Sequence, residues 1–228
     1  MPVEPAHNAL VSAWLRLPGN LRGVIWILMG SLAFALNDGV VKVLGLKFSA
    51  FQLAFVRYFV GFLLLTPVFM QMGKAGLATK RLDLHLARLV LACAAQVGVL
   101  YAVIHLYLAD ATAIAFSRPV FTTIVAVVLL SELVSAKRWI ATIAGFIGVL
   151  IMVRQGHAEF DTVALIAVAA ALVFAVANVL IRMLSKTEPP SRILFYYHLG
   201  GSIVFLGPAI WLWQQPVGVE WLMLGLIG

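Results

Sequence analysis

The sequence contains few charged residues and a single cysteine. Asp, Glu, Lys and Arg make up 11% of the 228 residues, whereas they make up about a quarter of a typical soluble domain. Hydrophobic residues reach 63%. This composition excludes an ordinary soluble domain and predicts a polytopic membrane protein. The lone Cys93 excludes an intrachain disulfide and a cysteine-rich metal site.

Motifs of membrane-embedded enzymes and of ATP-driven pumps are also missing. The aspartates stand singly, whereas prenyl-transferring enzymes need paired aspartates to hold magnesium and phosphate. No serine lies in a glycine-rich turn with a histidine partner, and no G-x-x-x-x-G-K-[ST] loop is present. We therefore expect no catalytic site and no metal.

Long apolar runs dominate the chain instead. A membrane helix needs about 20 apolar residues to cross roughly 30 Å of hydrocarbon. The runs predict helices over 23–45, 49–70, 86–108, 111–130, 137–154, 162–184 and 193–213. An eighth run begins near Val219 and covers about half a span before Gly228. The predicted fold class is an all-α polytopic membrane protein in contact with the lipid bilayer.

The basic residues favour a cytoplasmic N-terminus, because short cytoplasmic connections carry an excess of Lys and Arg. With this orientation, the residues that face the cytoplasm are Arg16, Arg22, Lys74, Lys80, Arg81, Arg88, Lys137, Arg138, Arg182, Lys186 and Arg192. Only Lys42, Lys47 and Arg154 face outside. We interpret the net charge of +7 as an orientation signal, not as a nucleic-acid site, and residues 1–22 as a cytoplasmic leader. A signal peptide cleaved after Ala35 is the alternative.

An internal repeat links the two halves of the chain. Asn37 matches Asn178, Arg57 matches His198 and Pro67 matches Pro208 at one offset, since 178 − 37, 198 − 57 and 208 − 67 all give 141. Five predicted spans separate the copies, and an odd number inverts the second copy in the membrane. Inverted repeats are typical of secondary transporters, whose two halves exchange conformations around a site near the midplane. The repeat also requires 23–45 to remain a helix, which disfavours a cleaved signal peptide.

Buried polar residues mark the candidate substrate or gating positions. At about 1.5 Å of rise per residue, six of them fall in the outer third of the membrane and two in the inner third, one layer for each gate. We expect Gln96 near the midplane. The candidates are Asn37, Asp38, Arg57, Gln96, Tyr101, His105, Arg118, Asn178 and His198.

Structural roles compete with each of these assignments. Arg57 and Arg118 could extend their charged heads to the outer interface, and an ion pair between Asp38 and Arg57 could be purely structural. His105 could be an interfacial residue, and Asn178 and Gln96 could hydrogen-bond a neighbouring helix. The tyrosines Tyr58, Tyr101 and Tyr107 could belong to an aromatic belt.

The sequence "SRPVF" places an arginine directly before a proline inside an apolar run. Both are costly in hydrocarbon unless they line a cavity. We hypothesise that Pro119 bends this helix beside a polar pocket that Arg118 shares with Tyr101, His105 and Asp38. With Arg57, Arg118 and Asp38, the outer layer carries a formal excess of one positive charge, which favours a small-molecule substrate with a carboxylate or another anionic group.

The segment from Ala111 to Val153 resembles the end of an EamA-type domain of the drug/metabolite transporter superfamily. The matching residues are Pro119, Phe121, Glu132, Lys137, Arg138, Trp139, Gly145, Gly148 and Val149. Residues 51–69 resemble the family's second helix in Arg57 and Pro67. The resemblance covers 23–154 as a first repeat and 162–228 as a partial second repeat.

This resemblance implies ten helices in two inverted five-helix halves, which carry metabolites, amino acids, nucleotide-like compounds or drugs without a bound cofactor. The expected activity is alternating-access transport across the plasma or inner membrane. Relative to the family pattern, the chain lacks two and a half helices. It is therefore expected to be a fragment or a shortened product, with a non-transporting subunit or a channel as the alternative. Small residues at Ala141, Ala144, Gly145 and Gly148 predict close helix packing or a homodimer.

Overall fold

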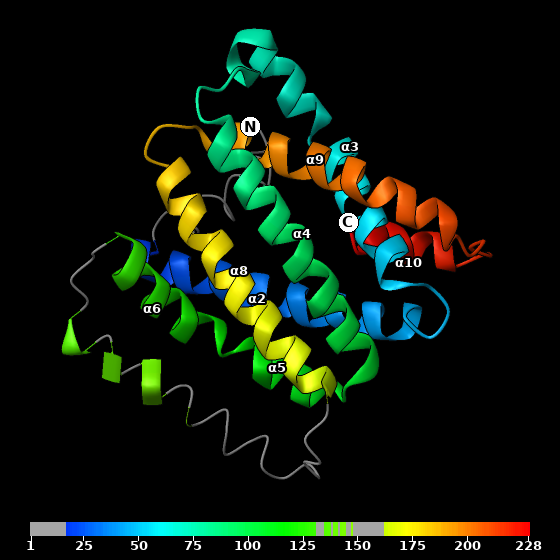
Figure 1. The fold of residues 1–228 in the computed structure, drawn as a ribbon, viewed down its shortest axis with the longest axis horizontal. Helices are drawn as coiled ribbons and strands as arrows, with labels where there is room; N and C mark the ends of the chain where they lie inside the picture. The colour runs from blue at the N-terminus through cyan, green and yellow to red at the C-terminus, as the bar shows by residue number, and fades with distance from the viewer. Residues whose placement is uncertain (1–16, 131–134, 138, 141, 145–146, 148–161) are drawn as a thin grey trace, which may run out of the picture. The chain divides into compact units, whose positions relative to one another are not determined.

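The computed structural model describes residues 17–130, 135–137, 139–140, 142–144, 147 and 162–228 (Figure 1). The chain divides into two compact units, Met1–Gly39 and Val40–Gly228. In the described residues, six helices are long and apolar enough to cross a membrane. The structure thus confirms an all-helical polytopic membrane protein.

The first unit contains most of α2 (Gly19–Leu44). The helix begins inside the predicted 1–22 leader, and the earlier part of that leader lies outside the described residues. Its apolar side chains are largely exposed, including Trp26, Ile27 and Phe34, as expected for a helix whose surroundings are lipid or protein. Asn37 and Asp38 belong to this unit.

The second unit contains α3 (Ala50–Leu77), α4 (Leu82–His105), α8 (Thr162–Leu184), α9 (Pro190–Trp211) and α10 (Glu220–Leu226). Within it, α3 packs along α9 and α4 packs along α8. In addition, α4 contacts α9, and α10 contacts α3. The bounds agree closely with the predicted spans 162–184 and 193–213.

The span predicted over 111–130 is confirmed as Leu108–Leu130, but the structure adds a turn inside it that the sequence interpretation did not contain. α5 (Leu108–Ala115) and α6 (Arg118–Leu130) are separated by a turn at Phe116 and Ser117. The hydroxyl of Ser117 donates to the carbonyl of Ile114 at 2.6 Å. Pro119 is then in the first turn of α6, where a missing N–H costs no helical hydrogen bond.

The predicted helix 137–154 lies largely outside the described residues, as do its small residues Ala141, Gly145 and Gly148. Ala144 is described and is exposed. The packing role of this helix and the homodimer stay predictions.

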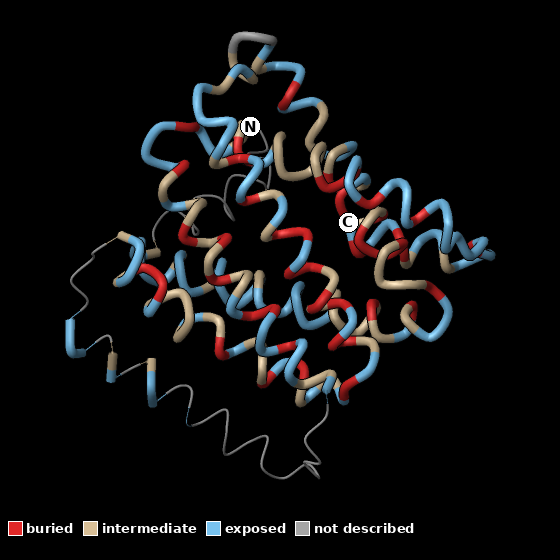
Figure 2. The backbone as a smooth tube through the Cα atoms, viewed as in Figure 1, coloured by how far each residue is buried: buried red, intermediate tan, exposed pale blue. Residues whose placement is uncertain are grey.

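The core of the second unit lies where its helices approach most closely (Figure 2). Tyr58 of α3 is fully buried, which corrects its possible assignment to an aromatic belt. Its ring covers Gly201 of α9, where a Cβ would collide with it. Between α4 and α8, a Cβ on Gly98 would lie 2.7 Å from Cβ of Ala170. Small residues at these two points allow close contact between the helices.

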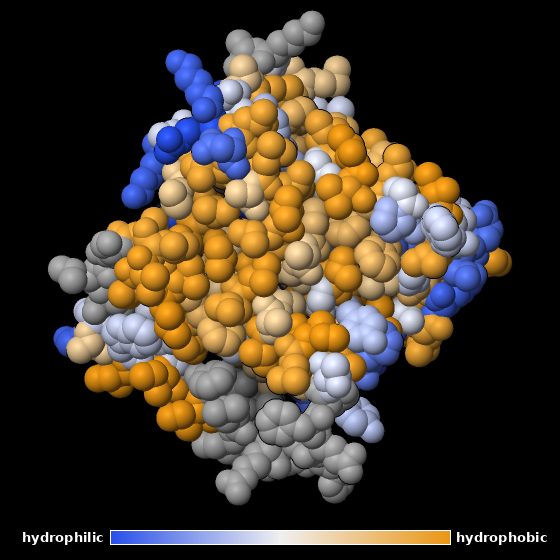
Figure 3. All heavy atoms as spheres, viewed as in Figure 1, coloured by the Kyte–Doolittle hydropathy of each residue, from blue (hydrophilic) through white to orange (hydrophobic). Residues whose placement is uncertain are grey.

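Apolar side chains cover most of the surface in Figure 3, and hydrophilic ones gather in patches at opposite sides of the view. The hydrogen bonds of the second unit likewise define two ends. The end that includes Lys47, the start of α3 and the last residues of α4 and α9 is called the Lys47 face below. The end that includes Glu188, the start of α4 and the start of α9 is called the Glu188 face.

Candidate functional site

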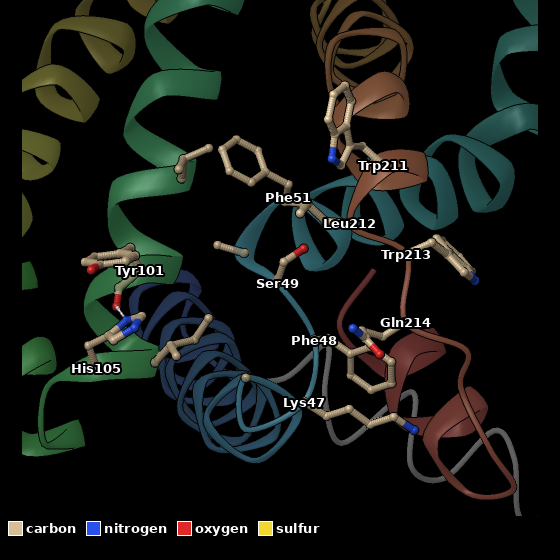
Figure 4. A pocket seen from close by; sticks show the side chains of 14 residues that line it. Lys47, Phe48, Ser49, Phe51, Tyr101, His105, Trp211, Leu212, Trp213 and Gln214 are labelled. Atoms are coloured by element: carbon tan, nitrogen blue, oxygen red, sulfur yellow. Dashed lines mark hydrogen bonds between the residues drawn. The ribbon is translucent and has the colours of Figure 1, made fainter.

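A cavity of about 550 Å³ opens at the Lys47 face of the second unit. Three helices contribute to its wall: the start of α3, the last turns of α4 and the end of α9. Figure 4 shows Tyr101 and His105 on α4 at one side, Phe51 on α3, and Trp211 at the end of α9. The described lining residues are Gly45, Lys47, Phe48, Ser49, Ala50, Phe51, Val97, Tyr101, Ile104, His105, Trp211, Leu212, Trp213 and Gln214.

Tyr101 and His105 form one aromatic surface of this cavity. Their i, i+4 spacing predicts that they share a helix face, and their ring centroids lie 4.0 Å apart in a stacked arrangement. Nδ1 of His105 lies 2.8 Å from the carbonyl oxygen of Tyr101, a contact in which Nδ1 carries the proton. The imidazole is thereby oriented, which leaves Nε2 as the ring atom able to accept a hydrogen bond.

Polar contacts tie the helix ends together around the cavity. The ammonium of Lys42 donates to the carbonyl oxygens of Ile104 and Leu106, at 2.7 and 2.6 Å, and so joins the end of α2 to the end of α4. The amide of Gln52 donates to the carbonyl of Gln214 at 2.8 Å and accepts from its backbone N–H at 2.9 Å. These bonds fix the segment that follows α9 against the start of α3.

The salt bridge between Lys47 and Glu220 closes the outer edge of this region. Nζ of Lys47 lies 2.6 Å from Oε2 of Glu220, and both side chains are partly exposed. The same carboxylate oxygen accepts the backbone N–H of Val217 at 2.7 Å. The hydrogen bond from Lys47, followed by that from Val217, lowers the pKa of Glu220 below the ordinary carboxyl value.

The Glu188 face carries a buried polar cluster that sequence reasoning did not identify. Glu188 accepts hydrogen bonds from the Thr79 hydroxyl on Oε1 and from the Arg192 guanidinium on Oε2, both at 2.7 Å. Nε2 of His85 lies 4.0 Å from the same Oε2. The His85 and Glu188 side chains are 2% and 3% exposed, so this carboxylate depends on its protein partners and not on water.

The pKa of Glu188 reflects two opposing effects. Burial raises the pKa of the carboxyl, but the hydrogen bonds from Thr79 and Arg192 and the guanidinium charge outweigh it. The pKa therefore lies below the ordinary carboxyl value, and Glu188 is ionised at neutral pH. An ionised carboxylate accepts stronger hydrogen bonds than a neutral group does, so Glu188 can hold the helix ends together.

A second polar group lies deeper, between α3, α4 and α9. The guanidinium of Arg88 packs over the ring of Tyr197 at 4.4 Å, and the rings of Tyr58 and Tyr197 lie 4.7 Å apart. A ring nitrogen of His198 lies 3.3 Å from the carbonyl of Tyr58. His198 therefore contacts the backbone of the residue that follows Arg57, where α3 packs along α9.

The sequence-predicted residues are distributed over several regions of the structure. Tyr101 and His105 line the cavity. Nε of Arg57 donates to the carbonyl of Ile227 at 3.1 Å, and the guanidinium of Arg118 lies 4.8 Å over the Phe174 ring of α8. Arg118 is not among the described lining residues of the cavity, so its role in substrate binding stays a prediction.

The remaining candidates lie on α4 and α8. Gln96 is buried on α4, and its Nε2 has no hydrogen-bond partner among the described residues. Asn178 is half-buried on α8. Within the described chain, no group of three or more His, Cys, Asp or Glu residues is placed to hold a metal ion.

Sequence reasoning missed Glu188, Thr79 and His85 because it selected polar residues inside long apolar runs. Glu188 and Thr79 lie in connections, where charge is ordinary. The internal repeat could have indicated Glu188 and Thr79, because both match charged residues of the other repeat. At the offset of 141, Glu188 matches Lys47 and Glu220 matches Thr79.

Comparison with known proteins gives a consistent result. Residues 21–154 match the EamA-like transporter family. The chain is 30% identical over 208 residues to an S-adenosylmethionine uptake transporter of Rickettsia prowazekii, covering 91% of this chain and 71% of that protein. It is 30% identical over 209 residues to a riboflavin transporter of Vibrio cholerae, covering 90% and 70%.

A pseudopaline exporter of Pseudomonas aeruginosa is 27% identical over 192 residues, which cover 83% of this chain and 66% of that protein. No solved structure matches. The family match, the named relatives and the six apolar helices agree. The chain belongs to the EamA-like transporter family and is a multi-pass small-molecule transporter.

Proposed function

We propose that the cavity at the Lys47 face receives a solute with a planar nitrogen heterocycle and an anionic group, which the protein moves by alternating access. The proposal rests on the aromatic lining of this cavity. Phe51, Tyr101, His105 and Trp211 contribute ring surfaces from three helices around one opening. Aromatic side chains stabilise flat heterocycles by stacking, with about 1–3 kcal/mol for each stacked base.

The size and the relatives support this class of solute. A volume of about 550 Å³ lies within the range of roughly 300–1,000 Å³ that is usual for small-molecule sites. S-adenosylmethionine and riboflavin, named for two of the relatives, each contain a planar nitrogen heterocycle, and S-adenosylmethionine also carries a carboxylate. A cavity with ring surfaces can accept either of them without base-specific hydrogen bonds.

The charge of the lining supports an anionic group on the solute. Lys47 and His105 are the titratable bases of the described lining, which contains no Asp or Glu. Glu220 already neutralises much of the Lys47 charge, but the Lys47 ammonium has three N–H donors. A carboxylate on the solute could accept a hydrogen bond from this ammonium.

Alternating access is supported by the packing of the helices. At the offset of 141, α3 corresponds to α9 and α4 corresponds to α10. The contact between α4 and α9 therefore corresponds to the contact between α10 and α3 when the two repeats are interchanged. The structure contains both contacts. A cytoplasmic N-terminus and a location in the cell membrane complete the proposal, supported by the distribution of Lys and Arg.

Uptake by purified protein in liposomes tests the proposal. Tritiated S-adenosylmethionine and riboflavin would be supplied separately, and saturable uptake that unlabelled solute accelerates from the opposite side is the expected result. Uptake that rises linearly with concentration indicates a channel and contradicts alternating access. Absence of uptake for both solutes contradicts the proposed solute class, and uptake of riboflavin without uptake of S-adenosylmethionine contradicts the anionic group.

Two tryptophan variants locate the site. Trp211→Ala removes an aromatic wall of the cavity, whereas Trp221→Ala removes an exposed tryptophan of α10 that is not among the lining residues. We expect the half-saturation concentration to rise about tenfold for Trp211→Ala, as the loss of one stacked ring implies. Trp221→Ala should change it little. Equal effects of the two variants would place the solute elsewhere.

A further inference from the structure

Two polar contacts at opposite ends of the second unit occupy equivalent positions in the two repeats. Lys47 precedes α3 and pairs with Glu220 at the start of α10. Glu188 precedes α9 and accepts a hydrogen bond from Thr79, just before α4. The offset of 141 carries Lys47 onto Glu188 and Thr79 onto Glu220. We call the two contacts the Lys47 latch and the Glu188 latch.

Each latch joins one repeat to the other. The Lys47 latch runs from the first repeat to the second, and the Glu188 latch runs from the second repeat back to the first. The chemical groups differ, since one contact is a lysine with a carboxylate and the other is a hydroxyl with a carboxylate. The positions, not the residue types, are equivalent.

Hydrogen bonds next to each latch also join one repeat to the other. At the Lys47 face, Gln52 in the first turn of α3 binds the backbone of Gln214, in the connection that leads to α10. At the Glu188 face, Nε of Arg192 in the first turn of α9 donates to the carbonyl of Gly76 at 2.6 Å. The hydroxyl of Tyr196 donates to the carbonyl of Leu77 at 3.1 Å, at the end of α3 just before the connection that leads to α4.

The two latches differ in strength. The side chains of Lys47 and Glu220 are 38% and 27% exposed, and exposed ion pairs contribute only about 0–1 kcal/mol. Glu188 is 3% exposed and binds Thr79 across the repeat boundary, whereas its bond to Arg192 lies within the second repeat. Hydrogen bonds to a buried charge contribute about 1.5–3 kcal/mol each. The Glu188 face is therefore closed more firmly.

We propose that these latches are the two gates of the transport cycle and that their unequal strength keeps the Glu188 face shut while the Lys47 face opens first. This inference rests on the alternating access proposed above. The cavity adjoins the weaker latch, since Lys47 is one of its lining residues, and an incoming solute would enter at this face. Release at the other face then requires Thr79 and Arg192 to leave their partners across the repeat boundary.

A pair of cysteine reporters can measure both gates in one molecule. Ala50 and Ser191 are half-buried residues in the first turns of α3 and α9, and they correspond at the offset of 141. Ala50→Cys and Ser191→Cys would be placed separately in a Cys93→Ala background, because Cys93 is the only natural cysteine. The rate of reaction with a water-soluble maleimide would be measured in permeabilised proteoliposomes without solute.

Breaking either latch should change the two reporters in opposite directions. Lys47→Met should accelerate labelling at position 50 about threefold, as expected for an exposed ion pair, and slow it at position 191. Glu188→Gln should accelerate labelling at position 191 about tenfold, as expected for bonds to a buried charge, and slow it at position 50. Thr79→Val should act in the same direction as Glu188→Gln.

Matched controls separate gating from loss of structure. Lys47→Arg keeps the ion pair and should restore the parent rates. Thr66→Val removes a hydroxyl that bonds only within α3, to the carbonyl of Phe62, and should leave both rates unchanged. Faster labelling at both reporters, or a change confined to the mutated face, would overturn the inference. Because labelling needs no solute, failure of the solute proposal would appear separately, as absent uptake with reciprocal labelling intact.

Discussion

Thr79 donates its hydroxyl proton to Glu188 across 109 positions of the sequence, over a distance of 2.7 Å. This bond joins the connection before α4 to the connection before α9. Arg192 holds the other carboxylate oxygen, so neither oxygen of this buried group relies on water. The closure of the Glu188 face therefore depends on one ionised carboxylate.

Glu188→Gln is expected to destabilise the protein by about 3 kcal/mol at neutral pH, because it leaves the Arg192 charge without its partner. The pKa of Glu188 is lowered in the folded state, so its stabilisation is complete above the ordinary carboxyl pKa. The stabilisation is lost as the pH falls through the lowered folded-state pKa. Thermal unfolding in detergent across a pH series measures this. A parent and variant that differ equally at acid and neutral pH would contradict the assignment.

Gly201→Ala should lower the midpoint of thermal unfolding, because the added Cβ meets the ring of buried Tyr58. Overpacking of this kind costs about 1–3 kcal/mol. Gly207→Ala is the matched control on the same helix, since no atom lies within 4 Å of its Cβ position. If both variants unfolded at the same temperature, the close contact between α3 and α9 would be wrong.

Gly73→Ala should also destabilise the protein, for a different reason. Gly73 has φ of 61° and ψ of 176° inside α3, a conformation that side chains with a Cβ avoid. The expected cost is about 1–2 kcal/mol. Gly30→Ala in α2, a position without a positive φ or a close neighbour, should be neutral or stabilising. A neutral Gly73→Ala would show that the helix continues unbroken through this point.

Lys42→Met should loosen the attachment of α2 to the end of α4, because the ammonium binds two carbonyl oxygens there. We expect a loss of about 2 kcal/mol, given the usual strength of hydrogen bonds to a charged group. Hydrogen exchange of the amides around Leu106 would be the direct measurement and should become faster. Lys42→Arg retains the donors and should show the parent rate, whereas equally fast exchange in both variants would contradict the contact.

The spans were predictable because each depends on a local property. A run of about 20 apolar residues satisfies its backbone only as a helix in hydrocarbon, so 162–184 could be placed without knowledge of its neighbours. The turn between α5 and α6 was harder, because Phe116 and Ser117 are ordinary residues within an apolar run. Pro119 indicated an irregularity, but its position in the first turn of α6 depends on where the preceding helix ends.

The candidate site was predicted only in part. The spacing of Tyr101 and His105 places them on one face of α4, since that relation lies within a single helix. Trp211 and Phe51 were not selected, because aromatic residues in apolar runs are ordinary membrane residues. They reach the same cavity only when α3 begins, and α4 and α9 end, at the same face.

The sequence by itself determined that this is a multi-pass membrane protein with apolar helices and a family-typical first domain, because composition, helix length and motifs are local properties. The tertiary structure decided which polar groups meet. Glu188 and Thr79, like Lys47 and Glu220, are far apart along the chain, and a hydrogen bond forms only within about 3 Å. Such contacts exist only after the two repeats have packed together.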